Sequence, residues 1–309
     1  MRHLLLAAAL FVAGSFLMTE PSYANEPAPN KGGGDRVSGA AFATRSPVLA
    51  THGMAATSHP LASQIAIDIM KDGGNAVDAA IAANAALGLM EPTGNGIGGD
   101  LFAIIWDPKS KELYGLNASG RAPAGQSLGD LREKIAKSGL DDRYWKRDPA
   151  NGEGTDMEIP NWGSYSVTVP GTVDGWFTMH EKFGTKPMTD ILAPTIEYAR
   201  QGFPVTQLIG HYLGRSKGAF ERLHKAGVIE EIDNYKATYL IDGEAPKEGD
   251  IFKNPDLAKT LETIGKGGRD AFYDGPLTDV IEAYFKRIGG PLRKSDFAAQ
   301  TSNWVTPAS

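Results

Sequence analysis

Apolar residues follow two helical patterns in the first third of the chain, separated by a short polar break. They recur at helical spacing over residues 61–71 and again over residues 76–90. Asp72-Gly73-Gly74 ends the first helix, and Asn75 is the expected cap of the second. The second helix is rich in alanine, so other backbones can approach it closely on several sides. We therefore predict that it lies in the interior.

The segment before these helices has a different pattern. Residues 47–51 read as a short buried strand, and a loop follows them. Thr57 or Ser58 is the expected N-cap of the first helix, and Pro60 suits its first turn.

Four glycines between positions 94 and 99 follow the second helix. Glycine adopts positive φ and allows close backbone approach without steric cost, so the run predicts a tight, specific turn. The spacing also fits the G-x-G-x-x-G dinucleotide fingerprint, which requires a strand before the glycines and a helix after them. Here the order is reversed, which favours a closely packed connection from helix to strand.

A β-hairpin is predicted directly after the glycines. Residues 101–106 and 112–116 form its strands, and residues 107–110 form its turn. Residues 117–123 then have the composition of a loop.

The remainder reads as mostly helical. Helical patterns cover residues 128–138, 172–183 and 188–201, and most of 205–269, with breaks at Gly243 and Asn254-Pro255. Residues 141–158 read as a surface excursion and 167–171 as a short strand and turn, while the tail from 292 to 309 shows no clear element. Many helices and few strands predict a mixed α/β or α+β fold.

The N-terminus carries the pattern of an export signal. A basic start precedes an apolar run, residues 4–18, and Ser22-Tyr23-Ala24 offers small residues for cleavage. We read residues 1–24 as a removable signal peptide and residues 25–47 as a flexible leader; an uncleaved anchor is the alternative. The expected location is periplasmic or secreted.

Composition excludes several classes of chemistry. The 309 residues have 41% hydrophobic content and a net charge of −6, and no basic stripe suggests nucleic acid. There is no cysteine, which removes disulfides, thiol nucleophiles and thiolate metal sites. None of the six histidines has metal-ligand spacing, and no G-x-S-x-G elbow is present, so we expect no metal and no cofactor. The hydroxyl–imidazole neighbours Thr51-His52 and Thr57-Ser58-His59 are expected to cap or pack rather than to react.

Arg121 is the candidate binding residue. It lies in the loop after the hairpin, where a planar guanidinium suits bidentate capture of a carboxylate. An ordinary surface salt bridge is the alternative.

An ordered series of motifs resembles the gamma-glutamyltransferase (gamma-glutamyltranspeptidase) family from residue 47 to the C-terminus. The series is Gly53-Met-Ala55, Ser58-His-Pro-Leu-Ala62, Gly73-Gly-Asn-Ala-Val-Asp-Ala-Ala80, Gly96-Ile-Gly-Gly99, Val169-Pro-Gly171 with Gly175-Trp176, Tyr198-Ala199 with Gly202-Phe-Pro-Val205, Phe272-Tyr273 with Gly275-Pro276, and Asp296-Phe297.

The resemblance implies the αββα sandwich of the N-terminal-nucleophile hydrolases. It also implies an exported precursor that cuts itself into large and small subunits. The first residue of the small subunit is then a threonine nucleophile whose own α-amine serves as base. The reaction implied is transfer of a γ-glutamyl group from glutathione or a related amide, through an acyl-enzyme, to water or an amino acid.

The chain departs from the family pattern in two ways. It stops before the threonine segment, so we expect residues 48–309 to be a truncated large-subunit portion without catalytic residues of its own. In addition, glutathione-processing members carry their carboxylate-binding arginine where this chain has Ser119, and usually glycine where it has Asp100. Arg121 lies two residues beyond and is the expected substrate-binding residue. The alternatives are a divergent acyl amide hydrolase of the same superfamily and an inactive fragment.

Overall fold

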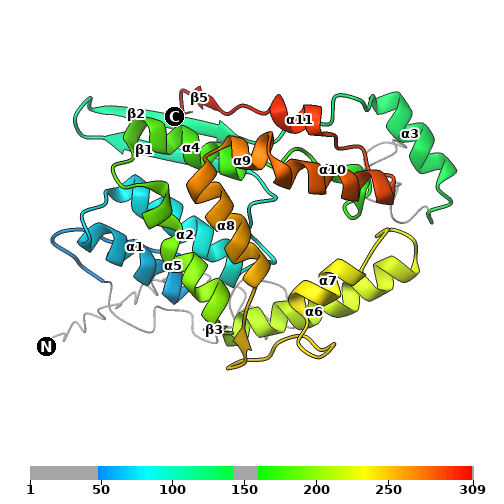
Figure 1. Ribbon diagram of the computed structural model, residues 1–309, viewed down its shortest axis with the longest axis horizontal. Coiled ribbons are helices and arrows are strands. Elements are labelled where there is room, and N and C mark those ends of the chain that lie inside the picture. The colour runs from blue at the N-terminus through cyan, green and yellow to red at the C-terminus, as the bar shows by residue number, and fades with distance from the viewer. Residues whose placement is uncertain (1–47, 142–158, 308–309) are drawn as a thin grey trace, which may run out of the picture. The chain divides into compact units, whose positions relative to one another are not determined.

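The computed structural model describes residues 48–141 and 159–307. Residues 50–309 form one compact unit, and residues 1–49 form another, of which only Val48 and Leu49 are described. The expected signal peptide, the leader and nearly all of the predicted surface excursion lie outside the described residues. The larger unit combines many helices with a small antiparallel sheet, as expected of an α+β fold (Figure 1).

Helices make up most of the described chain. In chain order they are α1 (Pro60–Lys71), α2 (Ala76–Met90), α3 (Leu128–Lys137), α4 (Thr172–Phe183), α5 (Met188–Gln201), α6 (Gln207–Lys225), α7 (Asp233–Tyr239), α8 (Pro255–Gly267), α9 (Asp270–Tyr273), α10 (Pro276–Ile288) and α11 (Lys294–Ala298). The helices predicted at 61–71, 76–90, 128–138, 172–183 and 188–201 are confirmed with these bounds.

The main sheet has the order β1–β2–β5 and is antiparallel throughout. Its strands are β1 (Leu101–Asp107), β2 (Glu112–Ala118) and β5 (Asn303–Val305). Leu101 pairs with Ala118 across the hairpin, which confirms the predicted hairpin, and Leu116 pairs with Trp304 of β5. A separate two-stranded sheet joins β3 (Phe203–Pro204) to β4 (Ile251–Phe252).

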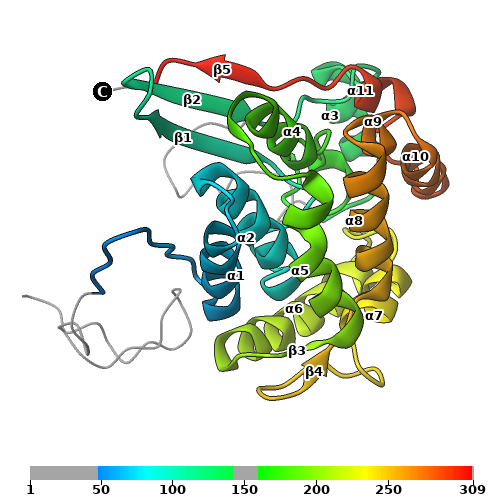
Figure 2. The same ribbon diagram turned by 60° about the vertical axis from the view of Figure 1, so that its left-hand side comes forward.

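Helices cover one face of the main sheet. α4 lies against β1 and β2, and α2, α5 and α8 pack in succession behind it (Figure 2). Gly175 permits the close approach of α4, because a Cβ there would lie 2.8 Å from Ala118 Cβ and 3.0 Å from Leu101 Cδ2. The apolar core therefore lies between the sheet and the helices.

The alanine-rich helix α2 is buried on several sides, as predicted. Asn75 caps it: its Oδ1 accepts from the backbone N–H of Val77 and Asp78, and the Asp78 carboxylate accepts from Asn75 N at 2.9 Å. Asp78 also accepts from Thr185 N at 3.0 Å and from the Thr185 hydroxyl. A buried carboxylate thus ties the start of α2 to the segment after α4.

The predicted N-cap of α1 is wrong. His59 caps the helix, with Nδ1 accepting from Leu61 N at 3.2 Å. The expected residues have other partners: the Thr57 hydroxyl donates to His59 O, and the Ser58 hydroxyl donates to Glu91. Pro60 occupies the first turn as expected, and it starts the helix one residue later than the hydroxyl pattern suggested.

Two predicted strands are absent from the part of the chain that the structure describes. Residues 48–51 are exposed and have no strand pairing. Residues 167–171 are irregular, because the N–H groups of Val169 and Gly171 donate to loop carbonyls instead of a neighbouring strand. An apolar, β-branched run is not a strand without a partner to pair with.

The tail, which showed no clear element in the sequence, contains α11 and β5. β5 is only three residues long, and it forms by pairing with β2, which lies nearly two hundred positions earlier. No local pattern signals such a short non-local strand.

Candidate active-site mouth

Three loops meet at one end of the main sheet, and we call this meeting point the mouth. The glycine turn is 94–100, the arginine loop is 119–123 and the proline loop is 167–172. Asn117 and Ala118, which the sequence assigned to the loop, extend β2 by pairing with β1. Gly171 N and Thr172 N both donate to Gly99 O, at 2.9 and 3.0 Å, and Val169 N donates to Arg121 O at 3.0 Å. The proline loop therefore bridges the other two, and three motif segments separated in the sequence lie together.

Two glycines make this meeting possible. A Cβ at Gly120 would lie 1.6 Å from Val169 O, and one at Gly171 would lie 1.9 Å from Ala118 O. Neither position accepts a side chain without moving backbone. The Thr172 hydroxyl reinforces the junction by donating to Gly99 O at 2.9 Å.

The two positions at which the chain departs from glutathione-processing members contact each other in the mouth. Asp100 Oδ1 accepts from Gly120 N at 3.1 Å, and Oδ2 lies 3.4 Å from the Ser119 hydroxyl, which donates to it. Ser119 N in turn donates to Asn117 Oδ1 at 2.9 Å. Asp100 is exposed, so its carboxylate faces solvent at the mouth while it fixes the arginine loop.

Arg121 lies in the mouth with its side chain exposed. Its carbonyl holds the proline loop, but its guanidinium makes no hydrogen bond or ion pair with any described residue. The surface salt bridge that the sequence left open is therefore not formed within residues 48–141 and 159–307. A buried residue anchors the loop beyond it, because Asp296 accepts from Ala124 N at 3.0 Å.

An apolar groove of about 460 Å³ opens beside the mouth. Ile97 and Gly98 of the glycine turn and Pro170 of the proline loop form one wall, and the apolar side of α10 forms another. Val280 on α10 is 70% exposed. The mouth thus combines an arginine without an ion-pair partner among the described residues, a fixed carboxylate and an uncharged groove.

The hydroxyl–imidazole neighbours behave differently from each other. The Thr57-Ser58-His59 group caps and packs as expected, although its capping residue is the buried His59 and not a hydroxyl. Thr51 Oγ1 and His52 Nδ1 are exposed and lie 2.9 Å apart, which corrects the expectation that this pair would cap or pack. Sequence neighbours can meet when the backbone bends, as it does at residues 51 and 52.

The described residues lack two kinds of feature. They hold no cluster of three or more groups that could bind a metal ion. None of their helices is long and apolar enough to span a bilayer.

Known proteins resemble this chain over most of its described length. The gamma-glutamyltranspeptidase family profile matches residues 62–309. The chain is 34% identical over 245 residues to a glutathione hydrolase proenzyme of Bacillus subtilis strain 168, an alignment that covers 79% of this chain and 37% of the relative. It is also 34% identical over 265 residues to an oxamate amidohydrolase proenzyme of Klebsiella pneumoniae, covering 84% and 44%. The chain therefore spans about two fifths of the length of these curated relatives.

Solved structures agree with the sequence comparisons. The crystal structure of Helicobacter pylori gamma-glutamyltranspeptidase superposes with a TM-score of 0.71 at 30% identity, covering 85% of this chain and 68% of that one. A cephalosporin acylase from Bacillus halodurans superposes with a TM-score of 0.69 at 34% identity, covering 87% and 47%. The fold is that of the N-terminal-nucleophile hydrolases, and the resemblance first carried by short motifs is confirmed: the chain belongs to the gamma-glutamyltranspeptidase family.

Proposed function

We propose that residues 48–309 are the front part of an exported, self-processing enzyme. The enzyme transfers or hydrolyses the γ-glutamyl group of glutathione or a related amide, through an acyl-enzyme on a threonine outside this chain. Family membership and the glycine turn, which belongs to the motif series shared with the family, support the reaction class. The chain alone is inactive on this proposal, because it supplies binding groups and no nucleophile.

The outer face of the main sheet is the proposed binding surface for the small subunit. Phe102, Ile104 and Trp106 of β1 are 66%, 72% and 58% exposed, and they lie on the face that no described helix covers. Leu113 of β2 and Val305 of β5 extend this apolar surface across the sheet. Contiguous apolar surface of this kind marks an interface. A second sheet from the same precursor is the partner that matches it, because sheets pack face to face through such residues.

Arg121 is the proposed anchor for the donor's carboxylate. Its guanidinium is exposed and free of partners among the described residues, so it can form two parallel hydrogen bonds to a carboxylate. Its backbone is held by the proline loop, which keeps the side chain at the mouth.

The test of the reaction uses the full-length precursor. We expect two associated chains by intact mass, the smaller beginning with threonine, and cleavage of a chromogenic γ-glutamyl anilide. Arg121→Ala should raise KM about tenfold or more, because a charge-assisted hydrogen bond is lost. The matched control is Arg132→Ala, an exposed arginine on α3. A single unprocessed chain, or equal KM values in both variants, would contradict the proposal.

The test of the interface places a charge on the outer face. Ile104→Lys should prevent association of the two chains, because it buries an unpaired ammonium between sheets. Leu128→Lys is the matched control, since Leu128 is a similarly exposed leucine on α3, away from the sheet. Normal assembly of the Ile104→Lys protein would show that the outer face is not the interface.

The proposal of export is tested separately. Cell fractionation of the native host should find the protein in the periplasm or the medium, with a mature N-terminus at Asn25. A cytoplasmic protein that retains Met1 would overturn this part alone.

A second candidate function is hydrolysis of an acyl amide other than γ-glutamyl. The observation that favours it is the contact between Asp100 and Ser119, which puts a carboxylate and a hydroxyl in place of a glycine and an arginine. An oxamate amidohydrolase proenzyme and a cephalosporin acylase are each 34% identical to this chain, as is the glutathione hydrolase proenzyme. The double variant Asp100→Gly with Ser119→Arg distinguishes the two candidate functions. If this variant cleaves a γ-glutamyl amide and the wild-type enzyme does not, the second candidate is favoured.

A further inference from the structure

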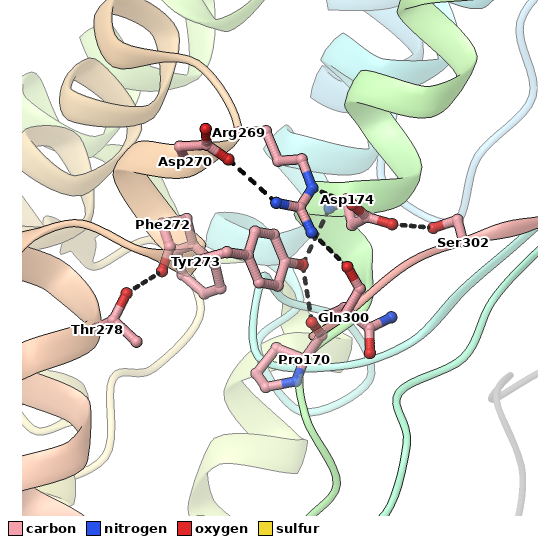
Figure 3. Close-up of polar contacts among 9 residues, drawn as sticks. All are labelled: Pro170, Asp174, Arg269, Asp270, Phe272, Tyr273, Thr278, Gln300 and Ser302. Atoms are coloured by element: carbon pink, nitrogen blue, oxygen red, sulfur yellow. Dashed lines mark hydrogen bonds and ion pairs between the residues drawn. The ribbon is translucent and has the colours of Figure 1, made fainter. Parts of the chain in front are cut away.

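A buried ion pair lies behind the mouth and connects four segments of the chain (Figure 3). Asp174 of α4 is 3% exposed, and one carboxylate oxygen accepts from Arg269 Nε at the start of α9. Burial by itself would lower the pKa of Arg269, but the hydrogen bond and charge of Asp174 raise it above its usual value. Asp174 therefore stabilises the charged guanidinium of the partly buried Arg269, and removing either partner leaves the other without its counter-charge.

One branch from this pair reaches the C-terminal strand. The Ser302 hydroxyl donates to the second oxygen of Asp174, and Arg269 Nη2 donates to Gln300 O. The next residue, Asn303, begins β5 and pairs with Asn117 of β2, the strand that leads into the arginine loop. The charged pair therefore clamps the chain directly before it enters the sheet beside the arginine loop.

A second branch reaches the proline loop. Arg269 lies over the ring of Tyr273, with Cζ 4.5 Å from the ring centroid. The Tyr273 hydroxyl donates to Pro170 O at 2.7 Å and accepts from Asp174 N at 3.0 Å. Tyr273 is fully buried, so this hydroxyl has no water to replace its partners. Pro170 is the centre of the loop that bridges Gly99 and Arg121.

We propose that Asp174 is a positioning residue that sets both sides of the mouth: the arginine loop through Ser302 and β5, and the proline loop through Tyr273. As a consequence for binding, which rests on the proposed amidase function, Asp174 controls KM without touching substrate. One branch leads through Ser302 and the other through the Tyr273 hydroxyl to Pro170 (Figure 3). At the mouth, Val169 N donates to Arg121 O.

Hydrogen exchange on the full-length precursor tests the positioning directly. Asp174→Asn should speed exchange about tenfold in both the 167–172 and the 303–305 amides, since a buried hydrogen-bonded charge is lost. Ser302→Ala should affect only 303–305, and Tyr273→Phe only 167–172. Each of these two variants removes one hydroxyl, so the two branches can still be tested separately if Asp174→Asn does not fold.

Asp256→Asn is the matched control, because it removes a carboxylate from the exposed Lys259–Asp256 ion pair on α8. It should leave both segments unchanged. Equal acceleration in β1 and β2 as well would mean general destabilisation, and it would overturn the proposal, as would an Asp174→Asn protein with wild-type exchange.

Kinetics then test the consequence for binding. In the processed enzyme, Tyr273→Phe should raise KM several-fold while kcat stays within about twofold, because the mouth shifts and the nucleophile does not. A fall in kcat at constant KM would contradict it. If the wild-type precursor cleaves no amide at all, the proposed function fails, whereas the exchange pattern still decides whether Asp174 positions the two loops.

Discussion

The two faces of the main sheet carry similar side chains but meet different surroundings. On the inner face, Leu101 and Leu116 are buried against the helices, with α4 lying directly on the sheet. On the outer face, Phe102, Ile104 and Trp106 are equally apolar and mostly exposed. A strand that is apolar at consecutive positions, as β1 is from Leu101 to Trp106, is typical of one buried on both faces. The comparison teaches that the amino-acid pattern of β1 anticipates a covering layer that the described residues do not provide.

The largest expected loss of stability distinguishes two leucines of strand β2, one on each face of the sheet. Leu116→Ala should lower the free energy of unfolding by about 3 kcal/mol, because a 2% exposed side chain leaves a cavity in the core. Leu113→Ala, on the open face of β2, should cost much less. Urea unfolding of both variants measures the difference. Equal losses would mean that the open face is covered in solution.

A smaller loss of stability is expected when the buried carboxylate of Asp78 is removed. Asp78→Asn should cost about 2 kcal/mol, because Asn75 N and the Thr185 groups lose a charged acceptor. Asp130→Asn removes the equivalent carboxylate from the capping box of the exposed helix α3 and should cost clearly less. Thermal unfolding compares the two, and similar losses would show that burial does not strengthen the cap.

The contribution of Asp78 to the stability of the fold should decrease as the pH falls. Burial raises its pKa, but hydrogen bonds from Thr185 and Asn75 outweigh this and lower it below the usual value. The carboxylate therefore stabilises the fold above about pH 4 and ceases to do so as pH falls further.

The buried His59 should also make the stability of the fold depend on pH, with a more gradual change. Burial lowers its pKa, because the charged imidazolium loses water, and Nδ1 must stay unprotonated to accept from Leu61 N. Stability should be fully present above about pH 6.5 and fall as acidification protonates the ring. His59→Asn keeps an acceptor for the cap and should flatten this decline between pH 7 and 5. His211→Asn, at an exposed position, should leave the decline as in the wild type.

The smallest expected change in stability follows a substitution on the outer face of the sheet. Ile104→Ala should change the stability of this chain alone by no more than about 0.5 kcal/mol, as for most exposed substitutions. In the processed two-chain protein the same change should cost more, because the proposed second sheet buries the side chain. Equal small effects in both forms would remove the reason for placing the interface there.

Local chemistry explains why much of the fold was predictable. The bounds of α1, α2, α4 and α5 follow from apolar spacing together with Asn75, Gly184 and Gly202, all of which act within a few residues of where they stand. The hairpin followed from two apolar segments and a polar turn. The cap at His59 was missed because an imidazole is a rarer capping group than the hydroxyls beside it.

The site was predictable only in part. The motif series contains the glycine turn and the proline loop of the mouth. The third loop was singled out by Arg121 and by its departure from the family pattern, and the role of Arg121 in binding stays a prediction. The Asp174 cluster gave no signal, because Asp174, Arg269 and Ser302 lie far apart in the sequence and each resembles an ordinary surface residue. The contact between Asp100 and Ser119 was likewise invisible, although both residues were noted separately.

The sequence by itself determined most of the long helices, the hairpin, the glycine turn and the family, because these depend on the spacing of neighbouring residues. Tertiary structure alone decided where β5 pairs, which face of the sheet is covered, and which buried charges meet behind the mouth. The physical reason is that pairing, burial and ion contact are properties of distance in space. A three-residue strand or a single aspartate carries no information about its partner until the chain has brought the two together.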